Sequence, residues 1–200
     1  MECCLPLSLL QDIWRNTYYR LPNMADDLSK PTLYFGYGSN LWKQQMLERC
    51  PTSKFLGIAR LKGYKWIINE RGYANVVEVD QEDRLDEKHI DVVWGLVYSL
   101  QQKDEDGLDR NEGVPFAYTK ENLEVHFWEA HHGKSPDVSD EKPVKVKMLV
   151  YINRKAVTPS KPKKEYIYRM NMGIKDALKE GLPEDYVKNV MRKFIPAEKT

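Results

Sequence analysis

The chain has 200 residues, of which 42% are apolar, and its 31 basic and 30 acidic side chains leave a net charge of +1. This length and composition suit one domain with a substantial core, and the balanced charge provides no general attraction for nucleic acid or a membrane surface. The three cysteines have neither a metal-binding spacing with the histidines nor the even number of a disulfide set, and no run approaches 18 apolar residues. We therefore expect a protein of a reducing compartment, with the cytoplasm as the default, and no membrane span.

Residues 1–32 differ in character from the rest of the chain and are predicted to form an N-terminal tail. They include a short apolar patch near the start, but Glu2 stands where a signal peptide would carry positive charge. Met24 precedes a short charged lead into the first predicted strand, so it could itself be an initiator. We expect residues 1–23 to be dispensable for folding and activity, and residues 33–200 to form a single domain.

The segment 33–40, Leu-Tyr-Phe-Gly-Tyr-Gly-Ser-Asn, is predicted to be a strand, a tight loop and the start of a helix. Its aromatic and apolar beginning is typical of a strand, and Ser39 and Asn40 are residues that favour helix N-caps. Gly36 and Gly38 would let an anion approach backbone N–H groups without a Cβ in the way. The loop is a candidate anion cradle, and a plain strand-to-helix turn is the alternative.

Two familiar glycine motifs do not fit this loop. A dinucleotide-binding loop needs a third glycine and an acid about 20 residues further on, but Leu41 follows Asn40 and residues 53–60 contain no acid. A serine nucleophile elbow requires Gly-x-Ser-x-Gly, and no second glycine follows Ser39. The sequence therefore excludes both motifs.

The segment after the loop predicts one helix and three strands. Trp42, Met46 and Cys50 recur every four residues, which predicts a helix that ends before Pro51. Apolar runs at 55–61 and 64–68 predict two strands joined as a hairpin at Lys62-Gly63, and 73–79 predicts a third strand. The charged residues 81–88 are expected to be a solvated connector.

Residues 92–100 give the strongest core strand, because nearly every side chain is β-branched, aromatic or otherwise apolar. Gly95 within it indicates a bend or a close backbone contact. The polar residues 101–112 come next and predict a short helix, and Gly113 is placed to cap its C-terminus.

The last part of the chain predicts two more strands and two helices, at 116–128, 144–152, 164–179 and 184–194. The loop 129–143 carries His131 and His132, and adjacent histidines in a polar loop without a third ligand do not predict a metal site. About six strands with few interleaved helices indicate an α+β fold with a mixed sheet that could close as a barrel.

Several segments, in order, resemble the γ-glutamylcyclotransferase family. Tyr-Phe-Gly-Tyr-Gly-Ser-Asn-Leu at 34–41 resembles its substrate loop, and Val-Trp-Gly-Leu-Val at 93–97 resembles its central strand. Leu-Asp-Arg-Asn-Glu-Gly at 108–113 resembles the segment with the catalytic glutamate, and 166–186 its C-terminal helix and turn. The resemblance spans about 33–194 and implies a small mixed β-barrel with flanking helices.

The same resemblance implies the activity and the site. It implies cyclisation of γ-glutamyl amino acids or peptides to 5-oxoproline, with release of the amino acid and without cofactor or metal. Glu112 is implied to be the general acid and base. The implied substrate-binding residues are Tyr34, Gly36, Tyr37, Gly38, Ser39, Asn40, Tyr118 and Tyr166. The expected partner is a small γ-glutamyl molecule rather than nucleic acid or a membrane, and a homodimer is the assembly to consider.

The cyclisation reaction indicates what these residues would have to do. The α-amine of the substrate attacks its own γ-carbonyl, so the protein must hold a folded conformer, move protons and stabilise an oxyanion. One carboxyl group can serve both proton transfers, and burial that raises the pKa of Glu112 would help it near neutrality.

Other functions remain open at this level. Related cyclotransferases act on glutathione, on γ-glutamylamines or on γ-glutamyl-cysteine conjugates of secondary metabolism, and the loop 129–143 could shape a pocket for such a leaving group. Asn40 after Ser39 favours the γ-glutamyl amino acid branch. A relative that binds a ligand or a protein without turnover is the alternative from another class.

Overall fold

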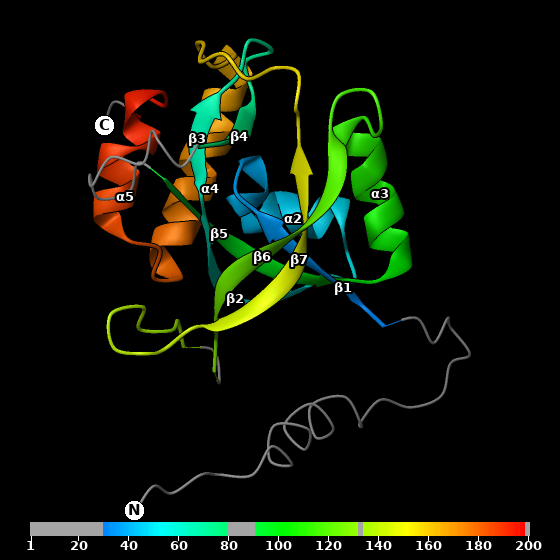
Figure 1. The fold of residues 1–200 in the computed structure, drawn as a ribbon, viewed down its shortest axis with the longest axis vertical. Coiled ribbons are helices and arrows are strands. Elements are labelled where there is room, and N and C mark those ends of the chain that lie inside the picture. The colour runs from blue at the N-terminus through cyan, green and yellow to red at the C-terminus, as the bar shows by residue number, and fades with distance from the viewer. Residues whose placement is uncertain (1–29, 80–90, 132–133, 199–200) are drawn as a thin grey trace, which may run out of the picture.

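The computed structural model describes residues 30–79, 91–131 and 134–198. Five strands form a closed barrel in the order β1 (Thr32–Gly36), β5 (Val92–Leu100), β2 (Lys54–Lys62), β6 (Thr119–Glu129) and β7 (Val144–Ile152). Neighbouring strands are antiparallel except where β1 and β7 meet in parallel, with Tyr34 opposite Leu149, and this contact closes the barrel (Figure 1). The predicted α+β fold with a small mixed barrel is confirmed.

The two remaining strands form a separate sheet. β3 (Tyr64–Ile68) pairs in antiparallel fashion with β4 (Ala74–Glu78), and Figure 1 shows this pair beside one end of the barrel. The predicted hairpin between 55–61 and 64–68 is wrong, because β2 pairs with β5 and β6 instead. Gly63, with φ of 77°, turns the chain out of the barrel, and its N–H donates to the carbonyl of Asp91. Closure satisfies both edges of β2, which a local hairpin would not achieve.

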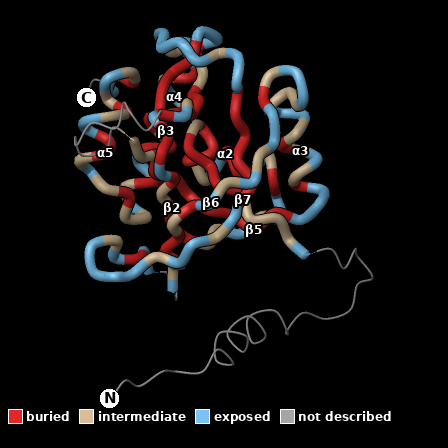
Figure 2. Tube along the Cα trace, viewed as in Figure 1, coloured by how far each residue is buried: buried red, intermediate tan, exposed pale blue. Residues whose placement is uncertain are grey.

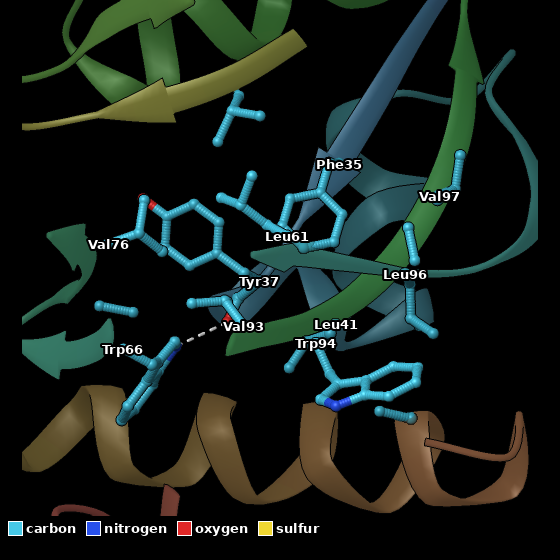
Figure 3. Close-up of a cluster of buried hydrophobic side chains, with 14 of the residues drawn as sticks. Phe35, Tyr37, Leu41, Leu61, Trp66, Val76, Val93, Trp94, Leu96 and Val97 are labelled. Atoms are coloured by element: carbon cyan, nitrogen blue, oxygen red, sulfur yellow. Dashed lines mark hydrogen bonds between the residues drawn. The ribbon is translucent and has the colours of Figure 1, made fainter. Parts of the chain in front are cut away.

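β5 is the central strand that its composition predicts. All its residues but the first are buried (Figure 2). Gly95 is a glycine because a Cβ there would stand only 2.5 Å from the carbonyl oxygen of Gly36. Phe35 lies opposite Val97 in the β1–β5 register, and both belong to the buried hydrophobic cluster (Figure 3). The end of β1, where the glycine loop begins, is thereby fixed against the core.

The helices agree with the sequence pattern over most of their length. They are α2 (Lys43–Arg49), α3 (Gln102–Glu112), α4 (Lys164–Lys179) and α5 (Glu184–Asn189), with 3₁₀ turns η1 (Ser39–Leu41) and η3 (Met191–Lys193). Gly113 caps α3 in the left-handed conformation, with φ of 68° and ψ of 40°. The predicted final helix at 184–194 is interrupted at Val190 and ends as η3, since terminal turns of helices often tighten to 3₁₀ geometry.

The arrangement around the barrel creates the setting of the site. In Figure 1, α3 lies along one side of the barrel and α4 along the other, with the β3–β4 pair beside the same end as the C-terminus of α3. No helix among the described ranges is long and apolar enough to cross a membrane. The predicted connector 81–88 and residues 1–29 of the predicted tail lie outside the described residues.

Candidate functional site

A cavity of about 230 Å³ lies where the loop after β1 meets α3, α4 and the β3–β4 turn. All of the residues proposed from the sequence line it except Gly36, which ends β1. The lining consists of Tyr34, Tyr37, Gly38, Ser39, Asn40, Arg49, Arg71, Tyr73, Ala74, Asn111, Glu112, Tyr118, Tyr151, Tyr166 and Arg169. The structure therefore brings segments from the whole described chain to one place.

The glycine loop forms a tight contact with α4. A Cβ on Gly38 would lie 2.9 Å from Tyr166 Oη and 3.2 Å from the Cβ of Ala74, so only glycine fits without displacement. The N–H of Ser39 donates to Tyr166 Oη at 3.1 Å, and that oxygen also accepts from the N–H of Ala74 at 3.3 Å. One backbone amide expected to face an anion is thus already paired within the protein.

The helix expected to start at Ser39 and Asn40 begins later. These residues form the 3₁₀ turn η1, and α2 starts only at Lys43. The backbone N–H groups in the first turn of α2 therefore belong to residues that do not line the cavity. Positive charge reaches the cavity through arginine side chains instead.

Glu112 is the one carboxylate among the described residues that line the cavity. It is the last residue of α3, and its side chain is 19% exposed. Oε1 accepts a hydrogen bond from Asn40 Nδ2 at 3.3 Å and lies 3.7 Å from Arg49 Nη1. In the described part of the chain, no donor is within hydrogen-bond distance of Oε2, which leaves that oxygen available to a ligand.

Burial sets the protonation behaviour of Glu112. Loss of hydration raises the pKa of this carboxyl above its ordinary value, while the Arg49 guanidinium and the Asn40 hydrogen bond act in the opposite direction. Burial is the larger effect. A carboxyl group with a raised pKa accepts and returns protons more readily near neutral pH.

The carboxamide of Asn40 connects three of the site residues. Its Nδ2 donates to Tyr34 Oη at 2.8 Å as well as to Glu112, and its Oδ1 accepts from Gln45 Nε2 and Arg49 Nη1, both at 2.9 Å. With donors on its oxygen and acceptors on its nitrogen, the amide has one favourable orientation. Asn40 therefore holds the glutamate and the loop in a fixed relation.

Three arginines at the cavity were missed by the sequence reasoning: Arg49 of α2, Arg71 of the β3–β4 turn and Arg169 of α4. Arg169 Nη1 donates to Ser39 Oγ at 3.3 Å, and its guanidinium lies 5.0 Å from the ring centre of Tyr166. Their positions in three separate elements give no local motif. With one carboxylate facing three guanidinium groups, the cavity favours an anionic ligand.

The tyrosines around the cavity are neutral hydroxyl groups. Burial raises the pKa of Tyr166 to about 12, and burial raises the pKa of Tyr34 and Tyr118 as well. Tyr118 Oη donates to the carbonyl of Ala74 at 2.9 Å, and Tyr151, which the sequence reasoning missed, donates to Asp109 Oδ1 at 2.7 Å. These hydroxyls can donate hydrogen bonds without adding negative charge.

The loop considered for a leaving-group pocket lies elsewhere. Ser135 Oγ donates to the carbonyl of Lys179, and the carbonyl of Glu141 accepts from Trp128 Nε1, so the loop packs toward the end of α4. No described residue of 129–143 lines the cavity. His132 lies outside the described residues, and within the described ranges no three His, Cys, Asp or Glu side chains are grouped to hold a metal ion.

Comparisons with known proteins show relatives in sequence and in fold. Residues 92–190 match the model of the AIG2-like family. The γ-glutamylcyclotransferase of Bos taurus is 29% identical over 159 residues, covering 79% of this chain and 76% of the relative, and that of Mus musculus is 27% identical over 162 residues, covering 77% and 74%. A solved structure of a γ-glutamyl cyclotransferase superposes with a TM-score of 0.59 at 22% identity, covering 86% of this chain and 91% of that one.

The family model includes the end of α3 with Glu112, the two sequence matches extend over most of the chain, and the structural match independently gives the same fold. Along most of its length the chain is therefore similar to γ-glutamylcyclotransferases, and its C-terminal half is similar to the AIG2-like family.

Proposed function

We propose that the protein converts γ-glutamyl amino acids to 5-oxoproline and the free amino acid, with Glu112 as general acid and base. The observation that carries this proposal is the position of Glu112, a largely buried carboxyl with a free oxygen in a cavity otherwise rich in arginine and tyrosine. The relatives that bear the name γ-glutamylcyclotransferase support the reaction class.

The proposed reaction forms one bond and breaks another. The α-nitrogen of the substrate bonds to the γ-carbonyl carbon and closes a five-membered ring, and the bond from that carbon to the leaving nitrogen then breaks. The α-ammonium loses two protons overall and the leaving nitrogen gains two, so Glu112 can carry protons in one direction and return to its starting charge. Because the reacting groups belong to one molecule, holding the folded conformer supplies much of the rate enhancement.

The cavity provides groups for each of these tasks. Oε2 of Glu112 is proposed to take the ammonium proton, since Oε1 is held by Asn40. The guanidinium groups of Arg49, Arg71 and Arg169 supply positive charge for the substrate carboxylate and the developing oxyanion.

The lining residues that the sequence had already indicated, besides Glu112, are proposed as substrate contacts. They are Tyr34, Tyr37, Gly38, Ser39, Asn40, Tyr118 and Tyr166. Gly36 does not line the cavity, and its carbonyl oxygen lies where a Cβ on Gly95 would approach it to 2.5 Å.

The direct test is release of 5-oxoproline by the purified full chain. γ-Glutamyl-alanine, glutathione and γ-glutamyl-lysine represent the amino acid, peptide and amine classes of substrate. We expect the highest kcat/KM with γ-glutamyl-alanine. Release from none of the three, with the protein folded by circular dichroism, would contradict the enzymatic proposal and favour a ligand-binding relative.

A further inference from the structure

A second and wider cavity, of about 480 Å³, opens next to the first. It is lined by Glu70, Arg71, Phe116, Ala117, Asn153, Lys155 and Ala156. Arg71 lines both cavities, and Ala117 directly precedes Tyr118, which lines the first. The two cavities are therefore neighbouring compartments with a shared arginine between them.

The walls of this second cavity come from three segments that Figure 1 shows at the same end of the barrel: the β3–β4 turn, the turn after α3 and the chain that leaves β7. The turn after α3 starts at Gly113, whose carbonyl accepts from the N–H groups of Phe116 and Ala117. This turn connects Glu112 to Tyr118, and Phe116 is one of its residues. Phe116 therefore lies in the segment that joins two residues of the first cavity.

The opposite wall is held rigidly by two buried asparagines. Asn75 Nδ2 donates to the carbonyls of Asn153 and Ala156 at 2.8 and 2.9 Å, and Asn153 Oδ1 accepts from the N–H groups of Lys155 and Ala156. The backbone at Lys155 is thus fixed, while its side chain is exposed. Lys155, whose ammonium group forms no ion pair with a described carboxylate, and Phe116 thus line the same cavity.

The chemistry of the lining combines an apolar surface with positive charge. Phe116 is 91% exposed, and the small side chains of Ala117 and Ala156 add to the apolar surface. Arg71 forms no ion pair with any described carboxylate, and Lys155 brings a second cation. Glu70 is the one acid of this lining, and its carboxylate is hydrogen-bonded by Thr158. An apolar side chain with a free carboxylate is the ligand that complements this set.

The volume of the first cavity limits how much of a γ-glutamyl substrate it can enclose. At about 230 Å³, it is smaller than the pockets of roughly 300–1,000 Å³ that enclose drug-sized ligands. It suits the γ-glutamyl group, whereas a bulky leaving amino acid must extend beyond it. Arg71 stands at the boundary where the γ-amide would pass from one compartment to the other.

We propose that the cavity at Phe116 and Lys155 is the leaving-group subsite, and that it selects γ-glutamyl derivatives of bulky apolar amino acids with a free carboxylate. The inference rests on the proposed function and deepens it. Phe116 contacts the apolar side chain, and Arg71 and Lys155 bind the carboxylate.

The test compares kcat/KM for γ-glutamyl-phenylalanine, γ-glutamyl-alanine and γ-glutamyl-phenylalaninamide. The wild-type protein is expected to prefer the phenylalanine over the alanine substrate by about tenfold, since a few apolar groups in a pocket discriminate by roughly that factor or more. Phe116→Ser should abolish most of this preference, by lowering kcat/KM for γ-glutamyl-phenylalanine more than that for γ-glutamyl-alanine. Because Phe116 is exposed, its replacement should leave folding intact.

Lys155→Gln should lower kcat/KM for γ-glutamyl-phenylalanine and γ-glutamyl-alanine, which both carry the free carboxylate, more than it lowers kcat/KM for the amide. Val157→Ser and Lys147→Gln are matched controls, because both residues are exposed and neither lines a cavity. The subsite would be overturned, with the proposed function left standing, if Phe116→Ser kept the preference for phenylalanine over alanine and Lys155→Gln kept the preference for the free carboxylate over the amide. Absence of 5-oxoproline from every substrate would overturn both.

Discussion

Asn40 and Glu112 stand 72 positions apart in the chain, yet Asn40 Nδ2 lies 3.3 Å from Glu112 Oε1. The asparagine belongs to the turn after β1, and the glutamate is the last residue of α3. Gln45 and Arg49 donate to the oxygen of the same carboxamide. The nitrogen of the carboxamide therefore faces Glu112 and donates to Oε1. The other oxygen of Glu112 accepts no hydrogen bond from the described residues.

The first prediction concerns Glu112→Gln. Glutamine keeps the size of the side chain but cannot take the ammonium proton, so we expect kcat to fall by about 10³–10⁴-fold with KM changed little. The measurement is steady-state release of 5-oxoproline from γ-glutamyl-alanine, with circular dichroism to verify the fold.

Glu124→Gln is the matched control for this variant. Glu124 is on the surface of β6 and pairs with Lys145, with 54% of its side chain exposed, so its replacement should leave activity unchanged. Glu121 suits this purpose less well, because its side chain is only 26% exposed and both of its oxygens accept hydrogen bonds from Arg154. If Glu112→Gln kept more than about a tenth of wild-type turnover, Glu112 would not be the base. Asp109 would be the next candidate, although Tyr151 and Lys120 already occupy its carboxylate.

The second prediction is a shift in the pH dependence of activity. The Arg49 guanidinium lowers the pKa of Glu112, in opposition to burial, so Arg49→Gln removes an effect that favours the charged carboxylate. The base must be ionised to take a proton. The acidic limb of kcat/KM against pH should therefore move to higher pH in Arg49→Gln.

Arg110→Gln provides the comparison. Arg110 is exposed on α3, two residues before Glu112, and does not line the cavity. Its pH profile should match that of the wild-type protein. An unchanged acidic limb in Arg49→Gln would mean that Arg49 does not act on the group that limits activity at low pH.

The third prediction separates the two glycines of the loop. A Cβ on Gly38 would meet Tyr166 Oη at 2.9 Å, whereas a Cβ on Gly36 would have its nearest neighbour at 3.4 Å, an ordinary contact. Gly38→Ala should lower kcat/KM by about 10²-fold, because small displacements of positioning groups have effects of that size. Gly36→Ala should stay within about twofold of wild type. Equal activities of the two variants would show that the fit of Gly38 against Tyr166 is unimportant.

The sequence predicts the elements of this fold well where local signals dominate. The boundaries of β7 and α4 match the apolar patterns, and Gly113 ends α3 because a left-handed residue is required there. The strand pairing of β2 could not be predicted in the same way. Its partners β5 and β6 lie far along the chain, and barrel closure, rather than the turn at Gly63, decides which edges meet.

The residues of the site also divide into those that local sequence motifs predict and those that they do not. The aromatic and glycine loop and Glu112 belong to motifs, and the structure brings them to one cavity. No sequence motif marks the cavity residues Arg71, Arg169 and Tyr151. Each reaches the cavity from a turn, a helix or a strand, and only tertiary packing determines the direction of that element. Surface arginines are common in a chain with 31 basic residues, so composition alone gives no reason to select them.

The last prediction concerns stability rather than activity. Burial raises the pKa of Glu112 in the folded protein, so the folded state binds this proton more tightly than the unfolded chain does. Below the ordinary carboxyl pKa of about 4.3 both states are protonated and burial has no electrostatic cost. As pH rises past that value, the unfolded chain releases the proton first, and the free energy of unfolding falls until the folded pKa is passed.

Glu112→Gln removes this titration, so its melting temperature should equal or exceed that of the wild type at pH 7. The difference between the two proteins should shrink as the pH falls toward 4. A Glu112→Gln protein that melts well below the wild type at pH 7, but not at pH 4, would show that the ionised carboxylate stabilises the fold through Arg49 and Asn40 more than its burial destabilises it.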